Sequence, residues 1–252
     1  MSAIPNLDAV TLELIKGAIQ SARAEMEALI ERTAMSPFIR EKKDYFTAFF
    51  DRDGRIAVST SLPLAAGNLM DCILERYARE EMQPGDLFLY NDSYGSGGAV
   101  SHNNDMVVVA PVFSEKRLIA FAEAWGHLWD IGGMVPGSIS PAACDVFQEG
   151  IVVPPSRVLR NGAWNEELIR AFVRNTRFPE MVRGDMSAIM AAVRLGSQRA
   201  QEVAERFGAA ALEAAFAGMI PRSPDREPAL RQVLLVEPPG AVPAACRRRH
   251  CC

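Results

Sequence analysis

Apolar residues recur with a helical period near the start of the chain. From Leu12 to Leu29 they are spaced alternately by three and four residues, which places them on one stripe of a helix. Asp8 precedes the stripe as a candidate N-cap, and Pro37 follows it as a candidate stop signal. The pattern therefore predicts one long N-terminal helix that buries a single face.

Short apolar runs separated by turns follow this helix. Residues 45–50 and 55–60 flank a glycine-containing turn and predict a β-hairpin. Residues 87–90 predict a short buried strand. Residues 106–113 and 118–124 predict a second hairpin around a polar turn, and its two strands are almost wholly apolar.

Helical patterns return between and after these strands. They predict helices over residues 68–81, 166–175 and 181–207, the last continuing to residue 217. Strands and helices thus mix without a regular β-α-β alternation, which favours the α+β class. We expect a long N-terminal helix, a mixed or antiparallel sheet with polar loops, and a helical C-terminal half.

The composition changes after residue 217. Six prolines interrupt residues 221–243, and the chain ends in Cys246-Arg-Arg-Arg-His-Cys-Cys252. Because proline blocks both helices and strand ladders, we expect one domain over residues 1–217 and a disordered tail over residues 218–252. A truncated or frame-shifted reading frame is a second interpretation of this tail.

Charge and cysteine content exclude several classes of protein. The chain has 27 Lys and Arg against 31 Asp and Glu, a formal net charge of −4, whereas proteins that bind nucleic-acid phosphates are usually basic. No apolar run approaches the roughly 20 residues of a membrane span, and no signal peptide is visible at the N-terminus. Five cysteines without a disulfide framework favour the cytoplasm.

Candidate chemistry lies in two polar, glycine-rich segments, residues 91–105 and 126–137. They contain His102 and His127, and Asp105 follows His102 by three residues. The apolar hairpin between the segments should fold the second beside the first. Two imidazoles and one carboxylate are typical ligands of an open catalytic metal site. Alternatively, the same side chains could hold the two loops together by hydrogen bonds.

Two further carboxylates, Asp92 and Asp130, lie in the same segments and are candidate catalytic residues. They could bind the metal, accept an imidazole N–H, or cap turns of the loops. The glycines of residues 95–98 do not form a phosphate-binding motif. The sequence therefore offers no nucleotide site of its own.

A series of short motifs runs through residues 8–217 in a fixed order: Asp51-Arg-Asp-Gly-Arg55, Pro84-Gly-Asp86, Asn91-Asp-Ser-Tyr94, Ser101-His-Asn-Asn-Asp105, His127-Leu-Trp-Asp-Ile-Gly-Gly133 and Gln148-Glu-Gly-Ile-Val-Val-Pro-Pro155. This series resembles the hydantoinase B/oxoprolinase family, which includes proteins of the N-methylhydantoinase B type and the alpha subunits of acetone carboxylase-type enzymes. Relatives in that family are longer than this chain.

The resemblance implies a divalent metal, with Mn, Zn and Fe not distinguished, held by His102, Asp105 and His127. It also implies a hydantoinase A-type partner that binds ATP, which would account for the missing phosphate loop. The expected activity is ATP-dependent hydrolysis of a cyclic amide, such as a hydantoin or 5-oxoproline. Alternatives are an acetone-type ketone carboxylase, or an inactive fragment that only binds the hydantoinase A-type partner.

The sequence departs from the family pattern at two places in the candidate loops. Many relatives have two consecutive histidines where this chain has His127 and Leu128, so we expect the absence of an imidazole that either supports the metal ligands or acts as an acid–base group. The common Asp-Pro-Tyr motif is Asp92-Ser93-Tyr94 here.

Overall fold

The computed structural model describes residues 7–60 and 68–220, and these residues form a seven-stranded sheet in the order β2-β1-β5-β4-β3-β6-β7. Every neighbouring pair of strands is antiparallel. The strands are β1 (Tyr45–Asp51), β2 (Ile56–Ser59), β3 (Leu87–Tyr90), β4 (Asp105–Ser114), β5 (Arg117–His127), β6 (Ser156–Arg160) and β7 (Ala163–Trp164). The α+β class is confirmed, and the sheet is wholly antiparallel.

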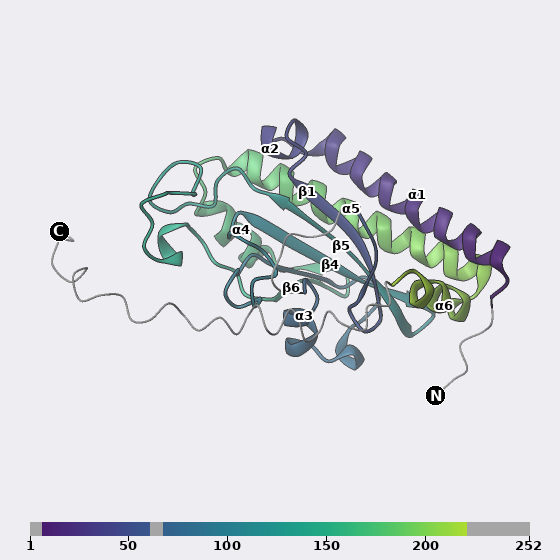
Figure 1. The fold of residues 1–252 in the computed structure, drawn as a ribbon. Helices are drawn as coiled ribbons and strands as arrows, with labels where there is room; N and C mark the ends of the chain where they lie inside the picture. The colour runs from purple at the N-terminus through teal and green to yellow at the C-terminus, as the bar shows by residue number, and fades with distance from the viewer. Residues whose placement is uncertain (1–6, 61–67, 221–252) are drawn as a thin grey trace, which may run out of the picture. The chain divides into compact units, whose positions relative to one another are not determined.

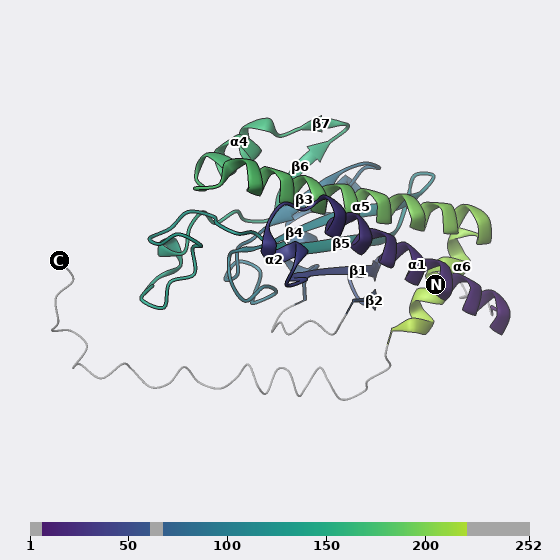
Figure 2. The same ribbon diagram turned by 90° about the horizontal axis from the view of Figure 1, so that it is seen from above.

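Helices cover one face of this sheet, where α1 and α5 run side by side (Figures 1 and 2). The helices are α1 (Ala9–Thr33), α2 (Pro37–Arg40), α3 (Asp71–Arg76), α4 (Glu166–Arg174), α5 (Pro179–Phe207) and α6 (Ala209–Met219), with 3₁₀ turns η1 (Arg79–Glu81) and η2 (Val146–Gln148). The predicted long N-terminal helix and helical C-terminal half are confirmed.

The predicted signals explain how α1 begins and packs. The Asp8 carboxylate accepts hydrogen bonds from the backbone amides at the start of the helix, as an N-cap should. Within the apolar stripe Ile15 and Met26 are fully buried, whereas Leu12 and Leu29 at its two ends are partly buried. A Cβ atom at Gly196 of α5 would lie 2.3 Å from the Met26 sulfur, so glycine allows the two helices to approach closely.

Alternation along the strands divides the core between the two faces of the sheet. Phe49 of β1 packs on the helix side, whereas Phe46 and Phe50 belong to a second apolar cluster on the opposite side. Helix α3 and part of the polar loop, including Val100, cover that second cluster. Both faces of the central strands are therefore buried.

The prediction of one helix over residues 68–81 is wrong in extent. Helix α3 ends at Arg76 because Tyr77 adopts an extended conformation, with φ −122° and ψ 116°. The Tyr77 hydroxyl accepts the Arg157 amide at 3.1 Å, and its ring centroid lies 4.8 Å from that of Phe88. These contacts with β6 and β3 override the local helical pattern.

The sequence pattern also does not predict β6 and β7, which form the last hairpin of the sheet. The predicted tail, residues 218–252, lies outside the described residues except for the end of α6 and Ile220. None of the helices within residues 7–60 and 68–220 is both long and apolar enough to cross a lipid bilayer.

Candidate metal centre

The hairpin of β4 and β5 brings the first two candidate ligands together. Asp105 is the first residue of β4, His127 is the last of β5, and the two are direct partners in the antiparallel register. Directly opposed side chains lie on the same face of a sheet. The Nδ1 atom of His127 is consequently 3.2 Å from Oδ1 of Asp105.

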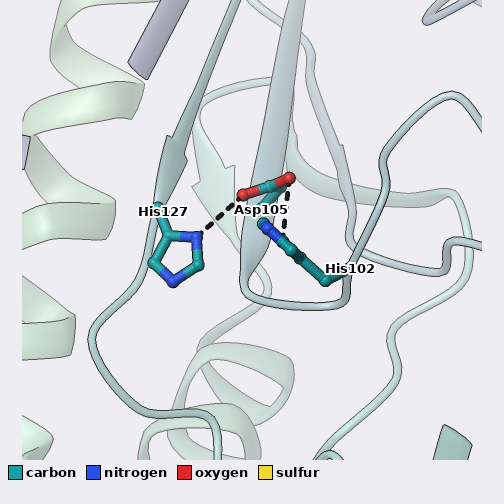
Figure 3. Close-up of side chains that lie close together, drawn as sticks. All are labelled: His102, Asp105 and His127. Carbon is teal, nitrogen blue, oxygen red and sulfur yellow. Dashed lines mark hydrogen bonds and ion pairs between the residues drawn. The ribbon is translucent and has the colours of Figure 1, made fainter. Parts of the chain in front are cut away.

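His102 approaches the same carboxylate from the loop before β4. Its Nδ1 atom lies 3.0 Å from Oδ2 of Asp105, so the two imidazoles flank one carboxylate (Figure 3). One ligand atom from each residue lies within 4.8 Å of the other two. The structure thus brings together the three residues that their spacing nominates.

The donor set fits a divalent transition metal. Two imidazole nitrogens and one carboxylate suit zinc, manganese or ferrous iron, and leave coordination positions open for water or substrate. Nδ1 of His102 is buried but forms no well-aligned hydrogen bond, despite its 3.0 Å distance from the Asp105 carboxylate. The three residues could therefore hold a metal ion.

The electrostatics of the cluster keep the carboxylate charged. Burial alone would raise the pKa of Asp105, which is 3% exposed, but hydrogen bonds and charge from both histidines outweigh burial and lower the pKa. The Asp105 carboxylate, 3.0 Å away, raises the pKa of His102 above 6.5, against the opposing effect of burial. An ionised carboxylate is the form that binds a cation.

Buried asparagines fix the loop that carries His102. The Asn91 amide donates to the backbone oxygens of Asn103 and Ile151 at 2.7 and 2.9 Å. The side-chain amide of Asn104 donates to the backbone oxygen of Leu128. The backbone N–H of Leu128 in turn donates to the backbone oxygen of Asn104 at 2.8 Å. No role for these asparagines was predicted from the sequence, although asparagine beside an apolar strand is a signal for loop bracing.

Asp92 and Asp130 lie in the candidate loops but contribute no atom to the cluster. Oδ1 of Asp92 accepts the Gly95 amide at 2.7 Å, which is a local turn. The Asp130 carboxylate is fully buried and binds one guanidinium and several amides, from Gly132, Gly137 and Arg177. These are the contacts of turn capping, one of the alternatives for both residues, and their catalytic role stays a prediction.

The contacts of Asp130 also set its charge. Burial would raise its pKa, but the amides of Arg177, Gly137 and Gly132 and the Arg177 guanidinium together lower it. The resulting ion pair, with 2.9 Å between Arg177 Nη1 and Asp130 Oδ2, ties the glycine-rich loop to the start of α5.

Aromatic rings form a wall beside His127. The ring centroid of Phe38 lies 4.7 Å from that of His127 and 5.1 Å from that of Trp129. Ser36 caps α2 and Pro37 occupies its first turn, which places Phe38 on this short helix. Phe38 was not among the predicted site residues, although the Ser-Pro pair is a readable start signal for such a helix.

Asp44 also approaches the cluster. Its backbone oxygen accepts the His127 amide at 3.0 Å, and its carboxylate Oδ2 lies 3.8 Å from the His127 Nδ1 atom. The segment between α2 and β1 therefore lies directly beside the candidate ligands.

The residue after His127 belongs to the apolar core. Leu128 is fully buried and belongs to the apolar cluster between the sheet and the helices. The position after His127 therefore contributes apolar packing and no ligand atom.

A sheet whose strand ends carry a buried Asp and an imidazole, joined by a second imidazole from the preceding loop, defines a candidate metal-binding protein. Comparison with known sequences gives its family. A sequence model described as hydantoinase B/oxoprolinase matches residues 8–236, so the chain belongs to this family. The match extends beyond residue 217, where the predicted domain ends. The predicted family is confirmed.

Two similar relatives carry names that describe one part of a larger enzyme. The chain is 31% identical over 206 residues to the beta subunit of caprolactamase from Pseudomonas jessenii, covering 80% of this chain and 35% of the relative. It is 31% identical over 222 residues to the B subunit of a putative D-/L-hydantoinase from Pseudomonas sp. (strain NS671), covering 84% and 37%. The chain thus spans little more than a third of these relatives.

Solved structures show the same fold. The ATP-dependent caprolactamase from Pseudomonas jessenii matches with a TM-score of 0.76 and 27% identity, over 85% of this chain and 37% of that one. The nucleotide-free acetone carboxylase matches with a TM-score of 0.70 and 16% identity, over 86% and 30%. At that lower identity the likeness to acetone carboxylase shows the fold alone.

Proposed function

We propose that this chain is the metal-holding part of an ATP-dependent hydrolase of cyclic amides. The observation that supports this most strongly is the convergence of His102, Asp105 and His127 on one point, with ligand atoms within 4.8 Å of one another. It occurs in a chain that is 31% identical to one subunit of a caprolactamase and to one of a putative hydantoinase. These relatives make a lactam or a hydantoin ring the favoured class of substrate.

The proposed chemistry combines a metal with a dry, aromatic wall. A divalent ion held here would act as a Lewis acid on an amide carbonyl or would make bound water more acidic. Asp105 supplies the negative charge that retains the ion, because its pKa is lowered. Phe38 and Trp129 would contact the methylene groups of a cyclic amide and exclude bulk water from the reacting carbonyl.

We propose that ATP is bound and used by a separate protein of the hydantoinase A type. The names of both relatives describe one subunit of a larger enzyme, and the sequence has no phosphate-binding glycine motif. Transfer of a phosphoryl group from ATP to the amide oxygen would turn a poor electrophile into a better one. The site on this chain would then receive the activated amide.

Reconstitution tests this proposal directly. The full chain, loaded with Mn²⁺ or Zn²⁺, is combined with a hydantoinase A-type protein and offered caprolactam, hydantoin or 5-oxoproline with ATP. We expect ring opening with stoichiometric release of ADP, and loss of both in Asp105→Asn.

A parallel assay supplies a ketone, bicarbonate and ATP, as a carboxylase of the acetone type would require. Carboxylation without any ring opening would overturn the proposal in favour of the carboxylase. Metal binding without either activity, in a complex that still forms, would favour a chain that only binds its partner.

A further inference from the structure

Two adjacent lysines beside the metal centre have different surroundings. The Lys43 ammonium lies 2.7 Å from Oε2 of Glu31, so its charge is compensated. The Lys42 ammonium has no carboxylate within 4.0 Å among residues 7–60 and 68–220. It lies instead over the ring of Phe38, 4.4 Å from the centroid. Lys42 is thus an uncompensated cation held by an aromatic ring.

The same ring connects Lys42 to the candidate ligands. Phe38 lies 4.7 Å from His127, so only one aromatic ring separates the ammonium from an imidazole of the cluster. The backbone amide of Lys42 donates to the oxygen of Pro37 at 3.2 Å, which fixes the turn after α2. The base of the side chain is therefore anchored, and its ammonium lies over the Phe38 ring.

The proposed reaction brings an anion to this place. A phosphorylated amide carries up to two negative charges on its phosphoryl oxygens, so a cation beside the metal centre would help to hold it. Lysine is a common ligand of phosphate because its compact ammonium donates up to three hydrogen bonds. Two other cations have carboxylate partners instead, Lys43 with Glu31 and Arg177 with Asp130.

We propose that Lys42 binds the phosphoryl group of the activated amide beside the metal centre, with Phe38 holding its ammonium over the ring. This inference rests on the proposed function and adds a substrate-binding residue to it. Lys43, one residue away, provides the matched control, because it carries the same charge but is paired with Glu31.

The test measures binding rather than turnover. The full chain and its Lys42→Gln, Lys42→Arg and Lys43→Gln variants are loaded with Mn²⁺, and bound Mn²⁺ is quantified by electron paramagnetic resonance. Inorganic phosphate is then titrated, and paramagnetic broadening of its phosphorus NMR signal reports binding near the ion. We expect equal Mn²⁺ binding in all four proteins and a phosphate affinity about tenfold or more weaker in Lys42→Gln.

The control variants decide the meaning of that loss. Lys43→Gln should bind phosphate as the unmodified chain does, and Lys42→Arg should retain most of the affinity because it keeps the charge. Equal phosphate affinity in Lys42→Gln and Lys43→Gln would overturn the inference while leaving the metal centre intact. Failure of the unmodified chain to bind Mn²⁺ would instead overturn the proposed function, and this inference with it.

Discussion

Two buried carboxyl groups lie on the same face of the β4–β5 hairpin and behave in opposite ways. Asp105 is opposite His127 in the register, and Glu123 is opposite Val109 further along the same two strands. Asp105 is 3% exposed and Glu123 is fully buried. The pKa of Asp105 is lowered, whereas burial raises the pKa of Glu123 well above 4.5.

The difference comes from the partners rather than from depth. Two imidazoles flank Asp105, whereas both carboxyl oxygens of Glu123 are without a hydrogen-bond partner among the described residues. Glu123 lies between Val109 and Ala48, which belong to the apolar cluster on that face. A buried carboxyl is therefore neutral by default, and only one supplied with cationic or hydrogen-bonding partners is ready to bind a metal.

The largest expected effect comes from the matched pair Asp105→Asn and Glu123→Gln. Asp105→Asn removes the charged ligand and should weaken metal binding by more than about 100-fold, since even indirect supporting residues cost roughly 10–100-fold. Glu123→Gln should leave it unchanged, because Glu123 offers no charge and lies away from the cluster. Isothermal titration of each chelator-treated protein with Zn²⁺ measures both. Equal affinities in the two variants would remove Asp105 from the site.

A second experiment removes the partner instead of the carboxylate. His127→Ala should lose most of the bound metal and should raise the pKa of Asp105, because burial would then be opposed by His102 alone. Without metal, the variant should also be about 1–3 kcal/mol less stable, since a buried partner loses its hydrogen bond. Metal analysis and thermal unfolding with chelator separate these effects. Unchanged metal content with a lowered melting temperature would show that His127 only holds the loops.

The sequence was sufficient for much of this arrangement. A helical stripe from Leu12 to Leu29 predicts α1. The apolar β4–β5 hairpin places the residue at the start of its first strand opposite the residue at the end of its second strand. That is why the spacing of Asp105 and His127 could nominate a pair that the register makes direct neighbours. A local sequence pattern is therefore enough to predict which residues are neighbours when a single hairpin turn determines the strand register.

Other features depend on contacts between distant segments, which one sequence does not encode locally. The pairing of Asp130 with Arg177 joins residues 47 positions apart, and the approach of Phe38 to His127 requires α2 to lie at the end of β5. The alternation of side chains along β5 assigns Glu123 to one face of the sheet, but it cannot show that other segments bury that face. The β6–β7 hairpin was missed although its turn carries a local signal, since Asn161-Gly162, with φ of 51° and 77°, is a typical hairpin turn.

A third prediction concerns the pH dependence of stability at Glu123. Its pKa is raised in the folded protein, so above about pH 4.5 the unfolded chain releases a proton that the folded chain keeps. The free energy of unfolding should then fall by up to about 1.4 kcal/mol per pH unit until the folded group ionises. Urea unfolding of the unmodified chain and of Glu123→Gln between pH 5 and pH 8, at constant ionic strength, should give curves that converge at low pH.

The smallest expected effect concerns His102 in the metal-free protein. Its pKa is raised by Asp105, so its contribution to stability is complete below pH 6.5 and is lost as the pH rises through the folded value. Metal binding should show the opposite trend, weakening as the pH falls through that same value, because protons compete for the imidazole nitrogen. Melting temperatures measured with chelator and with Zn²⁺ should therefore diverge with rising pH, since His102 stabilises the metal-free protein less while metal binds more tightly.

His102→Gln should reduce this divergence, whereas Asp92→Asn, which removes a carboxylate from the same loop, should retain it. A divergence of equal size in the two variants would mean that His102 neither binds the ion nor exchanges its proton for it.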